Sequence, residues 1–336
     1  MHMIRPAIAI IDDYQGLALK MADWSGIERQ ASIQVFTRPW KNEDDLVAHL
    51  EPFNIISLIR ERTAFPERVL ARLPNLELIS MTGARTTTLD IAACTRRGIP
   101  VAFTGGSPSH AAAEMAVALI LACARGLPQG DRAMRSGNWQ EGVPMGMELD
   151  GRRLGIVGLG KLGARVARIG LAMGMDVVAW SQNLTEERAA EHGVRRVEKE
   201  ELFATSDVVS VHLTLSPRTE RIIGQDEIAT MKQGAILVNT ARGPLVDETA
   251  LLQALQAGRI VAGLDVFDIE PLPAAHPLRS LPNVVLAPHL GYVVASSFEH
   301  FFRESARNIA LYLEGGMPKL MNPEVLESGK DAAGPA

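Results

Sequence analysis

The segment RLGIVGLGKLGARVARIGLAMG, residues 153–174, decides the fold of this chain. A short apolar run opens the segment, and glycines in GxGxxG spacing follow: Gly158, Gly160 and Gly163. A helical pattern begins at Lys161, and a second apolar run, DVVAW, covers residues 176–180. GxGxxG alone is a weak signal, but the strand–turn–helix–strand context is typical of a βαβ unit. The segment therefore predicts a doubly wound α/β domain.

The spacing of the glycines also predicts a ligand. In such a unit Gly158 permits the tight turn, Gly160 lets the backbone reach a pyrophosphate, and Gly163 lets helix and strand pack closely. The start of the helix then offers free N–H groups to the diphosphate of a dinucleotide. A glycine-rich turn without a ligand is the alternative, and the surrounding strand and helix patterns count against it.

The strand end that normally carries a ribose-binding acid lacks one here. Ser181, Gln182 and Asn183 follow DVVAW, at the place where an acid would bind the ribose 2′-hydroxyl. The missing acid removes a barrier to NADP, because an acid there would repel the 2′-phosphate. However, no arginine adjoins the strand end to attract that phosphate, and Glu186 and Glu187 follow closely. The cofactor is therefore NAD(H) or NADP(H), with NAD slightly favoured.

Strand-like runs alternate with helical patterns along the whole chain, which is typical of parallel sheets covered by helices. In the first third, strands are predicted over 7–12, 33–37, 54–59 and 76–81, and helices over 66–73 and 88–98. From residue 152 on, strands are predicted near 154–158, 176–180, 207–212, 235–239, 260–266 and 283–287, followed by a last helix over 295–313.

A long alanine-rich helix is predicted between these two regions, over residues 107–126. Ser107 suits the N-cap, Pro108 the first helical position and Gly126 the C-cap. The following segment, 127–150, is rich in glycine and methionine and has little periodicity. We therefore expect the helix to connect two domains.

Length and composition limit the class of protein. The 336 residues suggest about two domains, and the formal net charge of −5 gives no basic footprint for nucleic acid or an anionic membrane surface. The N-terminus has too short an apolar core for a secretory signal. Cys94 and Cys123 lie far apart without a CxxC motif, which indicates buried thiols in a reducing compartment. We expect a cytoplasmic protein with no metal, nucleic-acid or membrane partner.

Three consecutive predicted strands, 235–239, 260–266 and 283–287, are each followed by one ionisable residue: Arg242, Glu270 and His289. Ligands in such sheets bind at the carboxyl ends of strands. Taken singly, a loop arginine, a surface glutamate and a turn histidine are the simpler interpretations. Their shared position beside the glycine motif predicts a catalytic site.

Reduction of a 2-keto acid is the chemistry that suits this set. Arg242 can bind the carboxylate with two hydrogen bonds and polarise the keto oxygen. His289, as imidazolium, can donate a proton to that oxygen while a nicotinamide delivers hydride, and it acts as the base in the oxidation direction. Glu270, bonded to the other ring nitrogen, would fix the tautomer and favour the charged imidazole.

At these residues the chain resembles the D-isomer-specific 2-hydroxyacid dehydrogenase family, which includes glyoxylate/hydroxypyruvate reductases and phosphoglycerate dehydrogenase-like enzymes. The similarity extends over about residues 50–323. The matching segments are SHAAAEMAVALILACAR, LDGRRLGIVGLGKLGARVA, SDVVSVHLTLSPRTERIIG, MKQGAILVNTARGPLVDETAL, AGLDVFDIEP and NVVLAPHLGY. The resemblance implies that Arg242, Glu270 and His289 are the catalytic set of an NAD(P)-dependent dehydrogenase acting on the CH–OH group of D-2-hydroxy acids.

The resemblance also implies binding residues. Those expected to contact the cofactor are Gly158, Gly160, Lys161, Leu162, Gly163, Ser181, Leu213, Thr240, Ala241, Asp265 (to the carboxamide) and Gly291. The substrate carboxylate would face backbone amides of the loop MTGARTTTLD, residues 81–90, and its expected contacts besides Arg242 are Thr82, Gly83 and Ala84. Arg85 departs from the family pattern, and it either adds charge near the pocket entrance or points to solvent.

For the architecture, the resemblance implies two doubly wound parallel-sheet domains, with a Rossmann cofactor domain inserted into a flavodoxin-like substrate domain. The substrate domain would comprise residues 1–106 and 293–336, and the cofactor domain residues 107–292. The helix from Ser107 would act as a hinge. Homodimers would form through the cofactor domain and the segment 127–150.

Other functions and the substrate stay open at this point. A dinucleotide-sensing, corepressor-like binding protein is one alternative, although the complete catalytic set counts against it. Phosphite dehydrogenase is another, since a similar Arg, Glu and His set serves there, whereas formate enzymes typically carry Gln in place of Glu270. Glyoxylate, hydroxypyruvate and longer 2-keto acids all fit. Five residues either line an apolar substrate pocket or serve as core or subunit contacts: Trp139, Met145, Met147, Tyr292 and Phe298.

Overall fold

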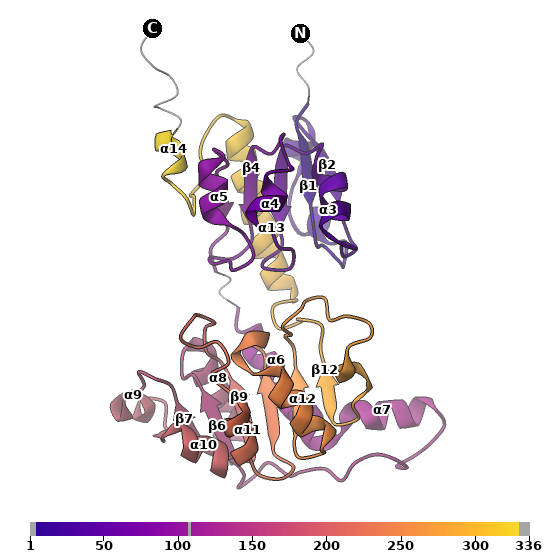
Figure 1. Cartoon of the computed structure of the whole chain (residues 1–336), viewed down its shortest axis with the longest axis vertical. Helices are drawn as coiled ribbons and strands as arrows, with labels where there is room; N and C mark the ends of the chain where they lie inside the picture. The colour runs from indigo at the N-terminus through magenta and orange to yellow at the C-terminus, as the bar shows by residue number, and fades with distance from the viewer. Residues whose placement is uncertain (1–4, 107–108, 329–336) are drawn as a thin grey trace. The chain divides into compact units, whose positions relative to one another are not determined.

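The computed structural model describes residues 5–106 and 109–328, and the chain divides into two compact units (Figure 1). The first unit joins Met1–Pro108 to Val294–Ala336, and the inserted unit is Ser109–Val293. Each unit contains one parallel sheet with helices packed on it. The predicted α/β fold with two parallel sheets is therefore confirmed.

The sheet of the first unit has five parallel strands in the order β2-β1-β3-β4-β5. Its strands are β1 (Ala7–Ile10), β2 (Ser32–Val35), β3 (Ile55–Leu58), β4 (Leu78–Met81) and β5 (Val101–Phe103). Its helices are α1 (Ala18–Met21), α2 (Ser25–Glu28), α3 (Glu43–Leu50), α4 (Glu67–Leu70), α5 (Ile91–Arg96), α13 (Ala295–Leu313) and α14 (Val325–Ser328). β3 and β4 are buried along their whole length, because central parallel strands are covered on both faces.

The last part of the chain completes the first unit. α13 packs on α1, α2, β4 and β5. Beyond α13, Leu320 forms a bridge with Ala102 in β5. The Val101 amide donates a hydrogen bond of 2.8 Å to the buried side chain of Asn322. Residues 320–322 therefore cover the outer edge of β5.

The inserted unit has a seven-stranded parallel sheet in the order β12-β11-β10-β9-β6-β7-β8 (Figure 1). Its strands are β6 (Arg153–Val157), β7 (Asp176–Trp180), β8 (Arg195–Arg196), β9 (Val208–Val211), β10 (Ile236–Asn239), β11 (Val261–Leu264) and β12 (Val284–Leu286). Its helices are α6 (Ala111–Arg125), α7 (Leu127–Arg135), α8 (Lys161–Ala172), α9 (Glu186–Ala190), α10 (Lys199–Thr205), α11 (Gln225–Thr230) and α12 (Glu248–Gln256), with 3-10 turns η1 (Gly243–Leu245) and η2 (Pro277–Ser280).

The long alanine-rich helix is α6, which lies against β10, β11 and β12. It begins at Ala111, later than predicted, and the expected capping residues Ser107 and Pro108 lie outside the described residues. It ends at Gly126 in the left-handed conformation, φ +58°, which confirms the predicted C-cap. The following helix α7 escapes prediction, since Gly130 and several charged residues interrupt its apolar pattern.

Among the described residues no single helix is long and apolar enough to cross a membrane. α6 and α7 reach the necessary length and apolar content only when taken together, and they are bent by 64° at their junction.

Candidate active site

The turn between β6 and α8 has the close packing that its glycines predict. Gly158 has φ +101°, and a Cβ there would lie 3.0 Å from the backbone of His212 and Leu213, just past β9. A Cβ on Gly163 would lie 2.1 Å from the carbonyl oxygen of Gly158. Side chains at these two positions would push α8 and β9 away from β6, so both glycines serve the fold itself.

Gly160 differs from the other two glycines, because a Cβ there would meet no atom within 4 Å. It is the N-cap of α8 and offers no capping side chain. The amides of Lys161, Leu162 and Gly163 in the first helical turn have no intrahelical acceptors. Open space beside free amides at a helix N-terminus suits the diphosphate of a dinucleotide. The turn therefore fits the cofactor that its sequence predicts.

Two strand ends flank this turn. Ser181 follows β7 and is partly exposed, and Leu213 follows β9 and packs on the core beside Gly158. Nε2 of His212 lies 2.8 Å from Oγ of Ser210. Burial lowers the pKa of His212 to about 4. The ring is therefore neutral at physiological pH and belongs to the packing of this strand end.

β10, β11 and β12 are neighbouring parallel strands, and they end at the same edge of the sheet. The turn after β10 is held by Asn239, whose side chain donates to the carbonyl of Arg242 at 2.8 Å and accepts from the amide of Ala241 at 3.0 Å. Thr240 in this turn is buried. The guanidinium of Arg242, partly exposed, donates a 2.6 Å hydrogen bond to the carbonyl of Ala241. The predicted arginine is thus presented by a braced turn.

The turns after β10 and β11 touch through their backbones. A Cβ on Gly243 would lie 2.2 Å from the carbonyl carbon of Phe267 and 2.5 Å from the amide nitrogen of Asp268. Only glycine allows this approach. It fixes the loop that carries Glu270 against the turn that carries Arg242.

Glu270 and His289 form a directly bonded pair. Oε2 of Glu270 lies 2.5 Å from Nδ1 of His289, and Oε1 accepts from the amide of Phe267 at 3.0 Å. The side chains are 22% and 19% exposed, so the pair is shielded but reachable. Tyr292 packs edge-on against the imidazole with ring centroids 5.4 Å apart. Glu270 thus leaves Nε2 of the ring for another partner.

Asp265, at the end of β11, is fully buried and holds the segment after His289. Its two carboxylate oxygens accept hydrogen bonds from the amides of Leu290, at 2.6 Å, and Gly291, at 2.8 Å. Burial raises the pKa of this carboxyl to about 6, although the two amides and His289 act in the opposite direction. The contact to a carboxamide implied by the resemblance stays a prediction.

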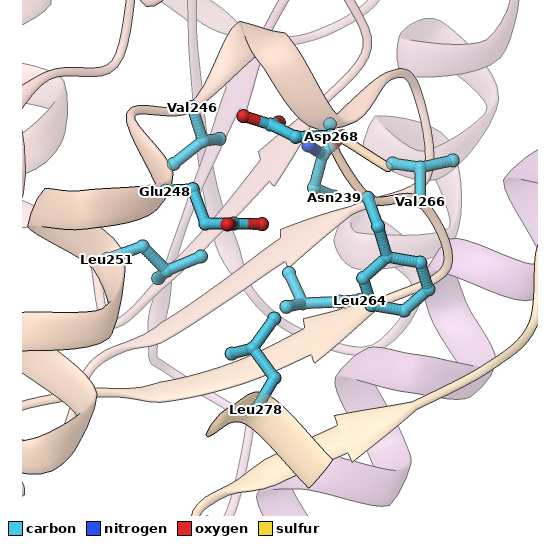
Figure 2. Close-up of a pocket in the computed structure, with 10 residues that line it drawn as sticks. Asn239, Val246, Glu248, Leu251, Leu264, Val266, Asp268 and Leu278 are labelled. Carbon is cyan, nitrogen blue, oxygen red and sulfur yellow. The ribbon is translucent and has the colours of Figure 1, made fainter. Parts of the chain in front are cut away.

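A small pocket lies beside these turns (Figure 2). Ten residues line it: Asn239, Gly243, Val246, Glu248, Leu251, Leu264, Val266, Phe267, Asp268 and Leu278. Burial raises the pKa of Asp268, and the nearby charge of Glu248 acts in the same direction. Arg242, Glu270 and His289 do not line this pocket, so it adjoins the catalytic set without containing it.

The predicted substrate loop belongs to the first unit. The amide of Thr82 donates to Leu58, and that of Gly83 donates to Oγ1 of Thr104 at 2.9 Å. Among the described residues, the amide of Ala84 has no hydrogen-bond partner. Of the three amides expected to face an anion, two are therefore engaged within the unit.

Thr82, Arg85 and Phe298 are predicted residues of the first unit, and the structure shows the surroundings of each. Oγ1 of Thr82 accepts from the amide of Arg60, whose φ of +56° is unusual outside glycine. Arg60 follows β3 just as Arg242 follows β10. The rule that ligands bind at the carboxyl ends of parallel strands would therefore also have singled out Arg60 as a candidate site residue. Arg85 is exposed. Phe298 is fully buried and stacks edge-on with Phe302, so it belongs to the core.

Comparison with known proteins assigns the family. Residues 117–291, just over half of the chain and all within the inserted unit, match the model described as D-isomer specific 2-hydroxyacid dehydrogenase, NAD binding domain. Glyoxylate reductase of Aeropyrum pernix is 38% identical over 268 residues, 77% of this chain and 80% of the relative. D-3-phosphoglycerate dehydrogenase of Archaeoglobus fulgidus is 37% identical over 263 residues, 78% of this chain and 50% of the relative. The chain thus spans about half the length of the phosphoglycerate dehydrogenases that it matches.

A solved structure extends the likeness beyond the inserted unit. Phosphoglycerate oxidoreductase from Vibrio cholerae O395 is 39% identical with a TM-score of 0.87, over 93% of this chain and 100% of that chain. Fold and site together define an α/β oxidoreductase with a nicotinamide-dinucleotide domain. The chain belongs to the D-isomer specific 2-hydroxyacid dehydrogenase family. The expected family and enzyme class are confirmed, and the sensor and phosphite alternatives are not favoured.

Proposed function

We propose that the protein reduces a small 2-keto acid to its D-2-hydroxy acid, and catalyses the reverse oxidation, with NAD(H) or NADP(H). The observation that carries this proposal is the Glu270–His289 pair at 2.5 Å, which shares the carboxyl edge of three neighbouring strands with Arg242. Family membership supports the same reaction class.

Proton transfer is the task of the bonded pair. Oε2 of Glu270 accepts a hydrogen bond from Nδ1–H of His289, which leaves Nε2 to face the substrate oxygen. In reduction, Nε2 donates its proton to the keto oxygen, and in oxidation it accepts the hydroxyl proton. A nicotinamide cofactor held at the glycine turn of Gly158, Gly160 and Gly163 would supply the hydride in reduction and accept it in oxidation.

Binding of the substrate carboxylate is the task of Arg242. A guanidinium has five N–H donors, enough for a bidentate contact alongside the bond to Ala241. The braced turn at Asn239 limits the motion of the arginine backbone, which keeps the charge in place.

The role of each unit follows the predicted domain plan. Residues 107–292 would bind the cofactor through the glycine turn, and residues 1–106 and 293–336 would contribute substrate contacts. Ala84 supports this assignment, because the residue is exposed and its amide has no hydrogen-bond partner among the described residues. The names of the relatives make two compounds the first to test: glyoxylate in the reduction direction, and 3-phosphoglycerate in the oxidation direction, where the absorbance of reduced nicotinamide should rise.

The test is the loss of reduced-nicotinamide absorbance, with NADH and NADPH in parallel, across a panel of 2-keto acids. Arg242→Ala should lower kcat/KM for the best substrate by about a hundredfold or more, since a charge-assisted bidentate contact is lost. Binding of the reduced dinucleotide, measured by nicotinamide fluorescence, should persist in the variant. Full activity of Arg242→Ala would contradict the proposal.

A homodimer formed through the inserted unit is part of the proposal. Met145 is 98% exposed and Trp139 67% exposed, and both lie on the segment after α7. Large exposed apolar side chains on one segment are typical of a subunit contact. Light scattering should give twice the chain mass, and the double variant Trp139→Glu, Met145→Glu should give the chain mass.

The cytoplasm is the proposed location. Cys94 and Cys123 are free thiols, and burial raises the pKa of both to about 12. Such thiols are typical of a reducing compartment. Fractionation of the producing cell tests this point.

A further inference from the structure

The loops after β7 and β9 are joined by a hydrogen bond. Nε2 of Gln182, the second residue after β7, donates to the carbonyl of Arg218 at 3.4 Å. The order β9-β6-β7 puts these loops on the two sides of the glycine turn that follows β6. The contact therefore brings an arginine from a distant segment to the end of β7, where the sequence alone offered none.

The end of β7 is the place where a dinucleotide-binding fold distinguishes its two cofactors. An acid there binds the ribose 2′-hydroxyl of NAD, whereas a nearby arginine accommodates the 2′-phosphate of NADP. This chain has the neutral hydroxyl of Ser181 in the first position after the strand. Without an acid, a phosphate meets no repulsion from that position.

The side chain of Arg218 is available for such a phosphate. The residue is exposed, and among the described residues its guanidinium has no hydrogen-bond or ion-pair partner. The neighbouring loop is braced independently, since Oγ1 of Thr219 accepts from the amide of Ser216 at 2.8 Å and donates to the carbonyl of Thr214 at 2.7 Å. Arg218 is thus a charged side chain on an ordered turn.

The acids that follow β7 do not neutralise this charge through a direct contact. Thr185, the N-cap of α9, accepts from the amide of Arg188. A hydrogen bond from its own backbone amide and a second from the Thr185 side chain lower the pKa of Glu187. Glu198 is paired with Arg196 at 2.8 Å. The carboxylates of Glu187 and Glu198 are therefore engaged elsewhere.

We propose that Arg218 and Ser181 bind the ribose 2′-phosphate of NADP(H), so that the enzyme prefers NADP(H) to NAD(H). The guanidinium supplies charge and paired N–H donors, and the hydroxyl supplies one more donor. This inference rests on the proposed function for its cofactor, and it revises the slight preference for NAD drawn from the sequence.

The binding test separates the 2′-phosphate from the rest of the cofactor. Titration calorimetry on the full chain would compare 2′,5′-ADP with 5′-AMP, which differ only in that phosphate. The wild type should bind 2′,5′-ADP about tenfold tighter or more, as expected for hydrogen bonds to a charged group. Arg218→Ala should remove most of this difference, and Ser181→Asp should reverse it.

Arg168→Ala is the matched control, because Arg168 is also an exposed arginine of this unit but lies on α8, beyond Gly163, the last glycine of the motif. It should keep the wild-type difference. Equal affinity of the wild type for both nucleotides, or an unchanged difference in Arg218→Ala, would overturn the inference. The kcat/KM ratio for NADPH over NADH should fall in Arg218→Ala by the same factor as the affinity ratio.

The two proposals fail in distinguishable ways. Selective binding of 2′,5′-ADP without turnover of any 2-keto acid would contradict the proposed reaction and keep the 2′-phosphate site. Turnover that is faster with NADH, with no selectivity for 2′,5′-ADP, would keep the reaction and contradict the 2′-phosphate site.

Discussion

Nδ1 of His289 lies 2.5 Å from Oε2 of Glu270, and the two residues follow neighbouring strands of one parallel sheet. The other carboxylate oxygen of Glu270 accepts from the amide of Phe267, so the glutamate is held by its own loop while it orients the imidazole. The Phe267 backbone in turn abuts Gly243, next to Arg242. The geometry of the three catalytic candidates is therefore set by backbone contacts as well as by side chains.

Replacing Glu270 with glutamine should lower kcat by about a hundredfold or more, because the amide offers one carbonyl oxygen for two donors and no charge for the imidazole. The pH profile of kcat should change as well, which a purely structural role would not produce. Glu248→Gln is the control, since Oε1 of Glu248 lies 3.2 Å from Nε2 of His276 in a second His–Glu pair outside the catalytic set. A similar loss in both variants would contradict the assignment.

Two glycines of the same motif should respond differently to alanine. Gly163→Ala should lower the free energy of unfolding by about 1–3 kcal/mol or more, because its Cβ would overlap the carbonyl of Gly158. Gly160→Ala should fold normally, since nothing lies within 4 Å of its Cβ position, yet lose dinucleotide affinity. Urea unfolding and nicotinamide fluorescence measure the two effects. Normal dinucleotide affinity in Gly160→Ala would argue against a cofactor at this turn.

Asp265→Asn should mainly lower kcat/KM, and it should lower the free energy of unfolding to a smaller extent. The carboxylate accepts one amide with each oxygen, whereas asparagine would face one of those amides with a donor. The segment after His289 should then shift, at a cost of about 1–3 kcal/mol for the unsatisfied amide. Steady-state kinetics and denaturant titration check this, and unchanged kinetics would show that the two bonds do not position His289.

His212 should make stability depend on pH. Its pKa is depressed from 6.5 to about 4, so the folded state binds fewer protons than the unfolded state between these values. The contribution of the neutral His212 ring to the free energy of unfolding is fully present above pH 6.5 and is lost as the pH falls through 4. From pH 7.5 to pH 5, the wild type should lose about 2 kcal/mol relative to His212→Asn. Asp12 and Asp265 have raised pKa values and act with the opposite sign, but they are common to both proteins. A pH-independent difference would contradict the lowered pKa of His212.

Local patterns predicted the elements well where an apolar run coincides with a complete element. β7 and α13 have the predicted bounds of 176–180 and 295–313. Other strands are shorter than predicted, as at β11, because Asp265 and Val266 stay buried after strand pairing has ended. Burial determines which residues are apolar, whereas backbone hydrogen bonding determines where a strand begins and ends.

Side-chain hydrogen bonds that hold the turns after the strands were beyond prediction. Asn239 reads as part of an apolar strand, and nothing in its neighbours indicates that it braces the turn of Arg242. Arg218 lies 36 residues from its partner Gln182, so no local spacing connects them. The ionisable residues at strand ends were predictable because a parallel sheet collects its carboxyl ends at one edge.

The closure of β5 by residues 320–322 has a consequence for synthesis. Until the ribosome has made that last segment, β5 presents an unpaired strand edge, and β4 and β5 lack the cover of α13. Bare strand edges and uncovered apolar faces are where nascent chains aggregate. The inserted unit has its own sheet and core, so it can fold while the first unit still lacks α13 and residues 320–322.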